Sequence, residues 1–88
     1  MFKANILQIK IDIIKLNSMI ENYPKKITYL IMSKETLDKF LIQTDLIYPL
    51  KDFKHQIMPK YSLKGFYSYM DYPIAICDIL DLGEVEIV

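Results

Sequence analysis

The chemistry-bearing residues that lie closest together are four carboxylates near the C-terminal end, Asp78, Asp81, Glu84 and Glu86. Paired carboxylates can hold a divalent cation or act as general acid and base. A metal loop brings more oxygen ligands at defined spacing, and a catalytic site brings a partner such as histidine or lysine. Neither accompanies this group, and aspartate is also a common turn residue. We interpret the cluster as a solvated turn, with a cation site and a catalytic site as alternatives.

The single histidine and the single cysteine show no motif spacing. His55 has only Asp52 nearby, and Cys77 lies in an apolar stretch, where a free cysteine usually acts as a small buried hydrophobe. One cysteine allows neither a disulfide nor a zinc cluster within the chain. The two glycines are far apart, so there is no phosphate-binding loop. The sequence therefore predicts a protein that is not an enzyme and needs no cofactor or metal.

The basic residues are all lysines, and none lies after Lys64. Arginine, the usual residue for bidentate contacts with phosphate and base edges, is absent from the sequence. Aromatic residues between 66 and 72 could stack on bases, but strand aromatics mostly fill cores. We therefore expect no nucleic-acid partner.

Charge is divided unequally along the chain. The first 64 residues carry 11 lysines and six acids, a net charge of +5, and the last 24 carry five acids and no base, a net charge of −5. The two parts either pack together and cancel, or the acids form a face for a basic protein partner. The second interpretation makes Asp78, Asp81, Glu84 and Glu86 candidate partner-binding residues.

The N-terminal stretch has the apolar spacing of one helix face. Six residues follow at intervals of 4, 3, 4, 3 and 4: Phe2, Ile6, Ile9, Ile13, Leu16 and Ile20. This predicts an amphipathic helix over about Lys3 to Glu21, which Pro24 stops. Residues 9–13 also alternate like a strand, but that pattern is much shorter, so we favour the helix.

The rest of the chain predicts one short helix and several strands. Ile27–Met32 is apolar on both alternating faces, as in a central strand covered on both sides. Ser33 suits an N-cap for a helix over Lys34–Gln43. Further predicted elements are a short edge strand near Lys54–Met58, an aromatic strand Phe66–Met70, a turn at Asp71–Pro73, and strands Ile74–Cys77 and Glu84–Val88 joined through Gly83, which suits a positive φ.

Together these elements predict one α+β domain over residues 1–88, in which the long helix lies across an antiparallel or mixed sheet of three to four strands. Leu7, Ile11 and Ile14 lie beside the main helical stripe. The hydrophobic share of 52% is high for a domain of this size. We therefore expect these three residues to contact a partner or a second copy in a dimer.

Targeting signals and membrane spans are not expected. Charged and polar residues interrupt the apolar N-terminus, and no small-residue cleavage site follows it. The same charges argue against a membrane span. The sequence therefore predicts a cytoplasmic protein.

Four segments are similar to the segment order of tailed-phage proteins, including part of the major capsid protein fold. They are Tyr29–Ser33, Glu35–Leu37, Tyr72–Asp78 and Gly83–Val88. In those proteins a strand ending in Met-Ser or Met-Asn precedes a short helix, and a later Gly-Tyr-Pro strand closes the sheet. This chain has Asp71 in place of that glycine and is far shorter than a capsid protein. The resemblance implies a phage or mobile-element origin and no catalytic residue.

Three functions follow as expectations. The first is a non-enzymatic phage-type module that binds a host protein stoichiometrically, most concretely an inhibitor of a host defence protein such as a CRISPR effector. The second is a virion or assembly protein that multimerises. The third is a small metal-binding or enzymatic domain that uses a hairpin from Asp78 to Glu86.

Overall fold

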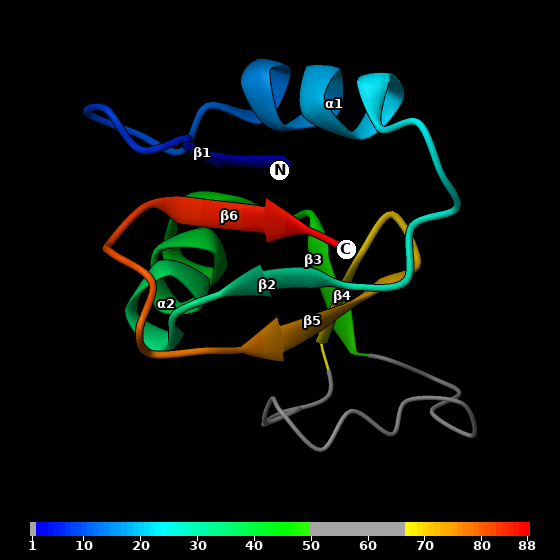
Figure 1. The fold of residues 1–88 in the computed structure, drawn as a ribbon. Helices are drawn as coiled ribbons and strands as arrows, with labels where there is room; N and C mark the ends of the chain where they lie inside the picture. The colour runs from blue at the N-terminus through cyan, green and yellow to red at the C-terminus, as the bar shows by residue number, and fades with distance from the viewer. Residues whose placement is uncertain (1, 50–66) are drawn as a thin grey trace.

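A computed structural model describes residues 2–49 and 67–88 of the chain. These residues form two helices and one mixed sheet of six strands (Figure 1). In chain order the elements are β1 (Phe2–Asn5), α1 (Ile13–Asn22), β2 (Leu30–Met32), α2 (Lys34–Gln43), β3 (Ile47–Pro49), β4 (Tyr67–Tyr69), β5 (Tyr72–Ile76) and β6 (Glu84–Ile87). The predicted α+β class is confirmed, but the sheet has six strands rather than three to four.

The strand order across the sheet is β1-β6-β2-β5-β4-β3. All neighbouring strands are antiparallel except β2 and β5, which pair in parallel. The predicted central position of the Ile27–Met32 segment is confirmed, because β2 lies inside the sheet and its three residues are buried. The strand itself is shorter than predicted and begins at Leu30.

Helix α2 has the bounds that the sequence predicts. The Ser33 Oγ accepts a hydrogen bond from the Thr36 N–H at 3.2 Å, which satisfies one of the free amide groups of the first turn. Glu35 lies in that turn, where the helix dipole favours an acid. Leu37 and Phe40 are buried on the face that contacts the sheet.

The N-terminal helix from Lys3 to Glu21 is wrong over its first half. Residues 2–5 form the edge strand β1, and α1 begins only at Ile13, where the Asp12 Oδ1 accepts from the Lys15 N–H at 3.0 Å. Phe2 and Ala4 alternate with Lys3 and Asn5, as in a strand, and the open edge of β6 offers this segment backbone partners. The Ile6 N–H donates to the Gly83 carbonyl at 2.9 Å, continuing the ladder.

The two C-terminal strands do not form the expected hairpin, because β2 lies between β5 and β6 in the sheet. The predicted last strand is present, and its residues alternate: Val85 and Ile87 are buried, and Glu84 and Glu86 are half-buried. The positive φ predicted for Gly83 is also confirmed, at +87°. The strand predicted near Lys54–Met58 lies outside the described residues.

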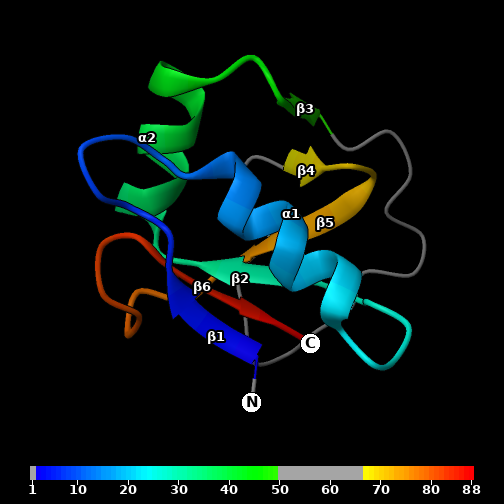
Figure 2. The same ribbon diagram turned by 90° about the horizontal axis from the view of Figure 1, so that it is seen from above.

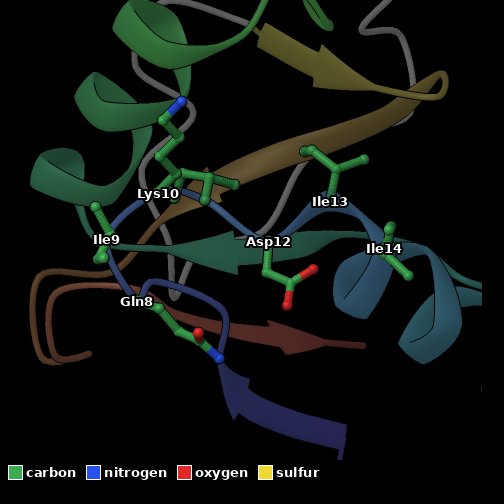
Figure 3. A pocket seen from close by; sticks show the side chains of 7 residues that line it. Gln8, Ile9, Lys10, Asp12, Ile13 and Ile14 are labelled. Atoms are coloured by element: carbon green, nitrogen blue, oxygen red, sulfur yellow. The ribbon is translucent and has the colours of Figure 1, made fainter.

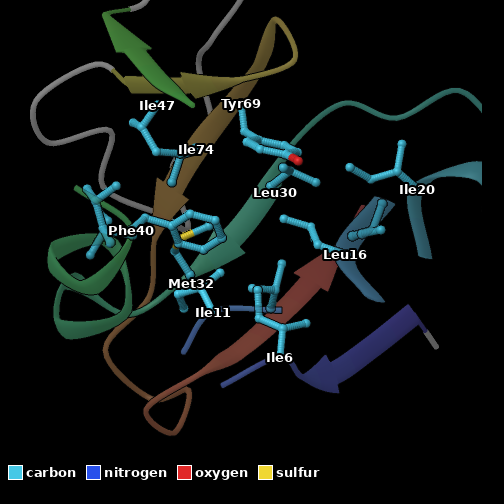
Figure 4. Packing of buried hydrophobic residues seen from close by; sticks show 14 residues of the cluster. Ile6, Ile11, Leu16, Ile20, Leu30, Met32, Phe40, Ile47, Tyr69 and Ile74 are labelled. Atoms are coloured by element: carbon cyan, nitrogen blue, oxygen red, sulfur yellow. The ribbon is translucent and has the colours of Figure 1, made fainter. Parts of the chain in front are cut away.

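The main core fills the space between the helices and one face of the sheet (Figure 2, Figure 4). Leu16 and Ile20 of α1 and Phe40 of α2 belong to the same buried cluster as Leu30 and Met32 of β2. Side chains on the opposite face of the central strands form a smaller cluster of Tyr29, Ile31 and Ala75, against which Cys77 packs. Neither helix in the described part of the chain is long and apolar enough to cross a membrane.

Candidate functional site

The predicted acidic residues do not come together as one site. The Asp78 Oδ1 accepts a hydrogen bond from the Lys34 N–H at 3.0 Å, so this carboxylate caps the N-terminus of α2. The Glu84 Oε1 accepts from the Asp81 N–H at 2.9 Å within the turn that leads into β6. Within residues 2–49 and 67–88, no group of three or more histidines, cysteines or acids is placed to hold a metal ion.

Lys3 lies beside the acids of β6. Its Nζ is 3.9 Å from the Glu84 Oε2, and the residue is opposite Glu86 in the register of β1 and β6. Lysine from the basic part of the chain therefore packs against acids from the acidic part. At this position the charge asymmetry is cancelled inside the fold, as the first of the two interpretations expects.

The three apolar candidates occupy different environments, because they do not share one helix. Ile11 is 8% exposed and belongs to the core, so little of its side chain is accessible for the predicted contact with a partner. Leu7 is half-buried and forms a β-bridge with Ile11 across a short loop. Ile14 is 84% exposed in the first turn of α1 and remains accessible to a partner.

Two adjoining hollows meet at Ile13 and together form what we call the Ile13 groove. The first has a volume of about 600 Å³ and is lined by residues 8–14 (Figure 3). The second, of about 410 Å³, lies between α1, the segment leading into β3 and the β4–β5 turn. Its lining consists of Ile13, Asn17, Leu46, Tyr48, Tyr69, Met70 and Asp71.

Apolar side chains stand exposed along this groove. Ile9 is 93% exposed and Ile14 is 84% exposed in the first hollow, and Leu46, Tyr48 and Met70 are exposed in the second. Single exposed apolar residues are common on proteins, but a contiguous apolar surface marks an interaction site. The groove is therefore the candidate binding surface.

The loop that carries Ile9 is held at its base by hydrogen bonds. The Asp12 N–H donates to the Ile6 carbonyl at 2.7 Å, and the Ile11 N–H donates to the Gln43 Oε1 of α2 at 2.8 Å. The Lys15 Nζ donates to the Asn5 carbonyl at 2.9 Å. These contacts fix both ends of the loop from which Ile9 projects.

The turn between β4 and β5 is strained. Met70 has φ +51° and Asp71 has φ +66°, and these two residues connect the paired Tyr69 and Tyr72. Turns of this kind favour glycine or asparagine, because the left-handed conformation costs other residues about 1 kcal/mol or more. Met70 is nevertheless 56% exposed, so burial of its side chain does not offset this cost. Such strain concentrates at functional sites.

No match emerges when the chain is compared with protein-family models, curated proteins and solved structures. The functional proposal below therefore depends on the Ile13 groove itself.

Sequence reasoning missed most of the groove. The signal for the β4–β5 turn was the spacing of Tyr69 and Tyr72, two strand residues separated by two others. Pro73 suggested a turn placed one residue too late, but proline is accommodated in β5. Ile13 and Leu46 could not be linked by sequence, because they belong to separate segments that only the fold brings together.

Tyr69 joins the floor of the groove to α1. Its hydroxyl donates a hydrogen bond to the Asn17 Oδ1 at 2.6 Å. Burial raises the pKa of the Tyr69 phenol above its ordinary value. The phenol is therefore protonated at neutral pH.

We expect the stability of the protein to fall in alkaline solution through Tyr69. Because its folded-state pKa exceeds that of the unfolded chain, the unfolded state loses the proton first. The contribution of Tyr69 to the free energy of unfolding is complete below about pH 10, and it decreases as the pH rises through the folded-state pKa. Urea unfolding at about pH 9 and about pH 11 measures this. Tyr69→Phe should show a smaller decrease than the natural protein, and an equal decrease in both would contradict the expectation.

Proposed function

We propose that this protein is a non-enzymatic protein-binding module and that it binds its partner through the Ile13 groove. The observation that carries the proposal is the strained and exposed Met70 in the lining of an apolar surface. A residue that costs stability in the free protein is explained if its side chain contacts a partner. Ile9 and Ile14 extend the same surface on the other side of Ile13.

The geometry of the groove suits a protein more than a small molecule. Its two hollows are open at the surface, and their exposed apolar side chains come from a loop, a helix and a turn. Interfaces of this kind place apolar and aromatic anchors at the centre and polar groups at the rim. Here Tyr48 and Met70 supply such anchors, and Lys10 and Asp71 supply charges. Inhibition of a host defence protein stays a prediction from sequence, and it does not specify the surface that binds.

Met70→Gly separates the two roles of the turn residue. Glycine adopts a positive φ without strain, so the folded protein should keep its stability or gain up to about 1 kcal/mol. Loss of the methionine side chain should weaken partner binding by about tenfold, the usual effect of removing a central apolar anchor. Urea unfolding measures the stability, and capture of partners by the tagged protein, with the mass of the complex from light scattering, measures the binding.

Ile79→Glu is the matched control, because Ile79 is 90% exposed and lies outside both hollows. It should leave binding unchanged. A partner that is retained by Met70→Gly but lost with Ile79→Glu would show that binding occurs on another surface, and the proposal would be wrong.

A further inference from the structure

We infer that the occupant of the Ile13 groove is a second copy of this chain. The inference deepens the proposed function, on which it rests, by naming the partner. In the dimer, the loop tip of each copy, residues 8–10, fills the hollow beside the β4–β5 turn of the other. The two copies are related by a two-fold axis that passes close to Ile13 and Ile14.

The groove has two complementary parts on opposite sides of Ile13. On one side the loop projects Ile9, which is 93% exposed. On the other side lies the hollow of about 410 Å³, with Tyr48 and Met70 in its lining. Figure 3 shows Ile9 and Lys10 on one side of Asp12, with Ile13 and Ile14 on the other. A two-fold rotation about the middle places the projection of one copy over the hollow of the other.

The charges of the two parts of the groove are also complementary across the two-fold axis. Among the described residues that line the two hollows, the charged ones are Lys10, Asp12 and Asp71. Asp12 is engaged at the start of α1, where its Oδ1 accepts from the Lys15 N–H. One positive charge therefore accompanies the projecting Ile9, and one negative charge lies in the hollow. The proposed dimer brings Lys10 of each copy to Asp71 of the other.

A symmetric dimer makes each of these contacts twice. In a two-fold interface, each contact between two different residues across the axis occurs a second time with the two copies exchanged. The exposed apolar side chains of both hollows are then covered together in each copy. The strain at Met70 is balanced by contacts formed only in the dimer.

Charge reversal tests the pairing directly. Sedimentation velocity across a range of concentrations measures the dimer dissociation constant of the natural protein and of the variants. Lys10→Asp and Asp71→Lys each place like charges together at two sites of the dimer, so each should raise the dissociation constant about tenfold or more. The double variant Lys10→Asp/Asp71→Lys restores opposite charges and should recover most of the natural affinity.

Two further variants separate charge from folding. Asp71→Asn removes the charge but tolerates the left-handed conformation, so it should weaken the dimer while keeping the circular dichroism of the fold. Lys39→Asp changes the charge of an exposed lysine on α2 outside the groove and should leave the dissociation constant unchanged.

A monomer at all concentrations would overturn the inference, and so would a dimer that Lys10→Asp and Asp71→Lys leave unaffected or that the double variant does not restore. These failures are distinguishable from failure of the proposed function. If the protein is monomeric but Met70→Gly still loses a captured partner, the groove binds a different protein and the proposed function stands. If Met70→Gly weakens neither the dimer nor the binding of a captured partner, both proposals are wrong.

Discussion

Replacing Ile11 with glutamate should unfold the protein, whereas the same change at Ile14 should leave it folded. Ile11 is 8% exposed and packs in the main cluster with Ile6 and Leu16. Loss of its burial costs about 2–3 kcal/mol, and burial of an unpaired carboxylate adds several more. The sum exceeds the stability of about 5 kcal/mol expected for a domain of this size.

Ile14 provides the matched comparison because it is the same residue type three positions later and is 84% exposed. Circular dichroism and urea unfolding of both variants check the folding. Ile14→Glu should retain a cooperative transition and lose association through the Ile13 groove, to which Ile14 belongs. If both variants fold equally well, Ile11 and Ile14 share an exposed helix flank, and the strand and loop at the N-terminus are wrong.

Replacing Gly83 with alanine should have the second large effect. We expect it to lower the free energy of unfolding by about 3 kcal/mol. A Cβ at this position would lie 2.5 Å from the Asn5 Oδ1 and 2.5 Å from the Leu7 Cβ, and the φ of +87° disfavours any side chain. Asn5 cannot move without cost, since its Oδ1 accepts from the Leu7 N–H and its Nδ2 donates to the Leu82 carbonyl. Each hydrogen bond contributes about 1 kcal/mol.

Thermal unfolding should show this loss as a decrease in Tm of about 10–20 °C. The control is a double-mutant cycle with Asn5→Ala, which removes the same two hydrogen bonds by itself. Because Gly83→Ala already disrupts them, the two losses should be less than additive. Additive losses would mean that Asn5 and Gly83 act independently, contrary to the contacts described above.

Several elements could be predicted because the local sequence carries all the information they need. Helix α2 has its N-cap in Ser33 and its first-turn acid in Glu35, and the structure confirms both of its ends. Strand β2 is apolar on both faces, and β6 alternates, so each matches one structural environment. The positive φ of Gly83 follows in the same way, since glycine is the residue that adopts it without strain.

The N-terminal segment was decided by contacts that no local pattern records. Residues 2–6 continue the helical spacing of the segment that follows, but intrinsic propensities differ by less than about 1 kcal/mol per residue. The decisive partner lies at the other end of the chain, where the open edge of β6 pairs with β1 and the Gly83 carbonyl accepts from the Ile6 N–H. Pairing and burial together outweigh the local preference, and Ile11 moves from a supposed partner face into the core.

The sequence by itself determined the α+β class, the second helix and the central strand. It could not locate the candidate site. Ile13, Leu46 and Met70 come from three segments, and only the sheet topology brings them into one groove. Asp78 and Glu84 are close in sequence, but their carboxylates accept hydrogen bonds at different places. Asp78 accepts at the N-terminus of α2, and Glu84 accepts in the turn that leads into β6. A binding surface is formed by proximity in space, and proximity between distant segments is set by tertiary packing rather than by residue spacing.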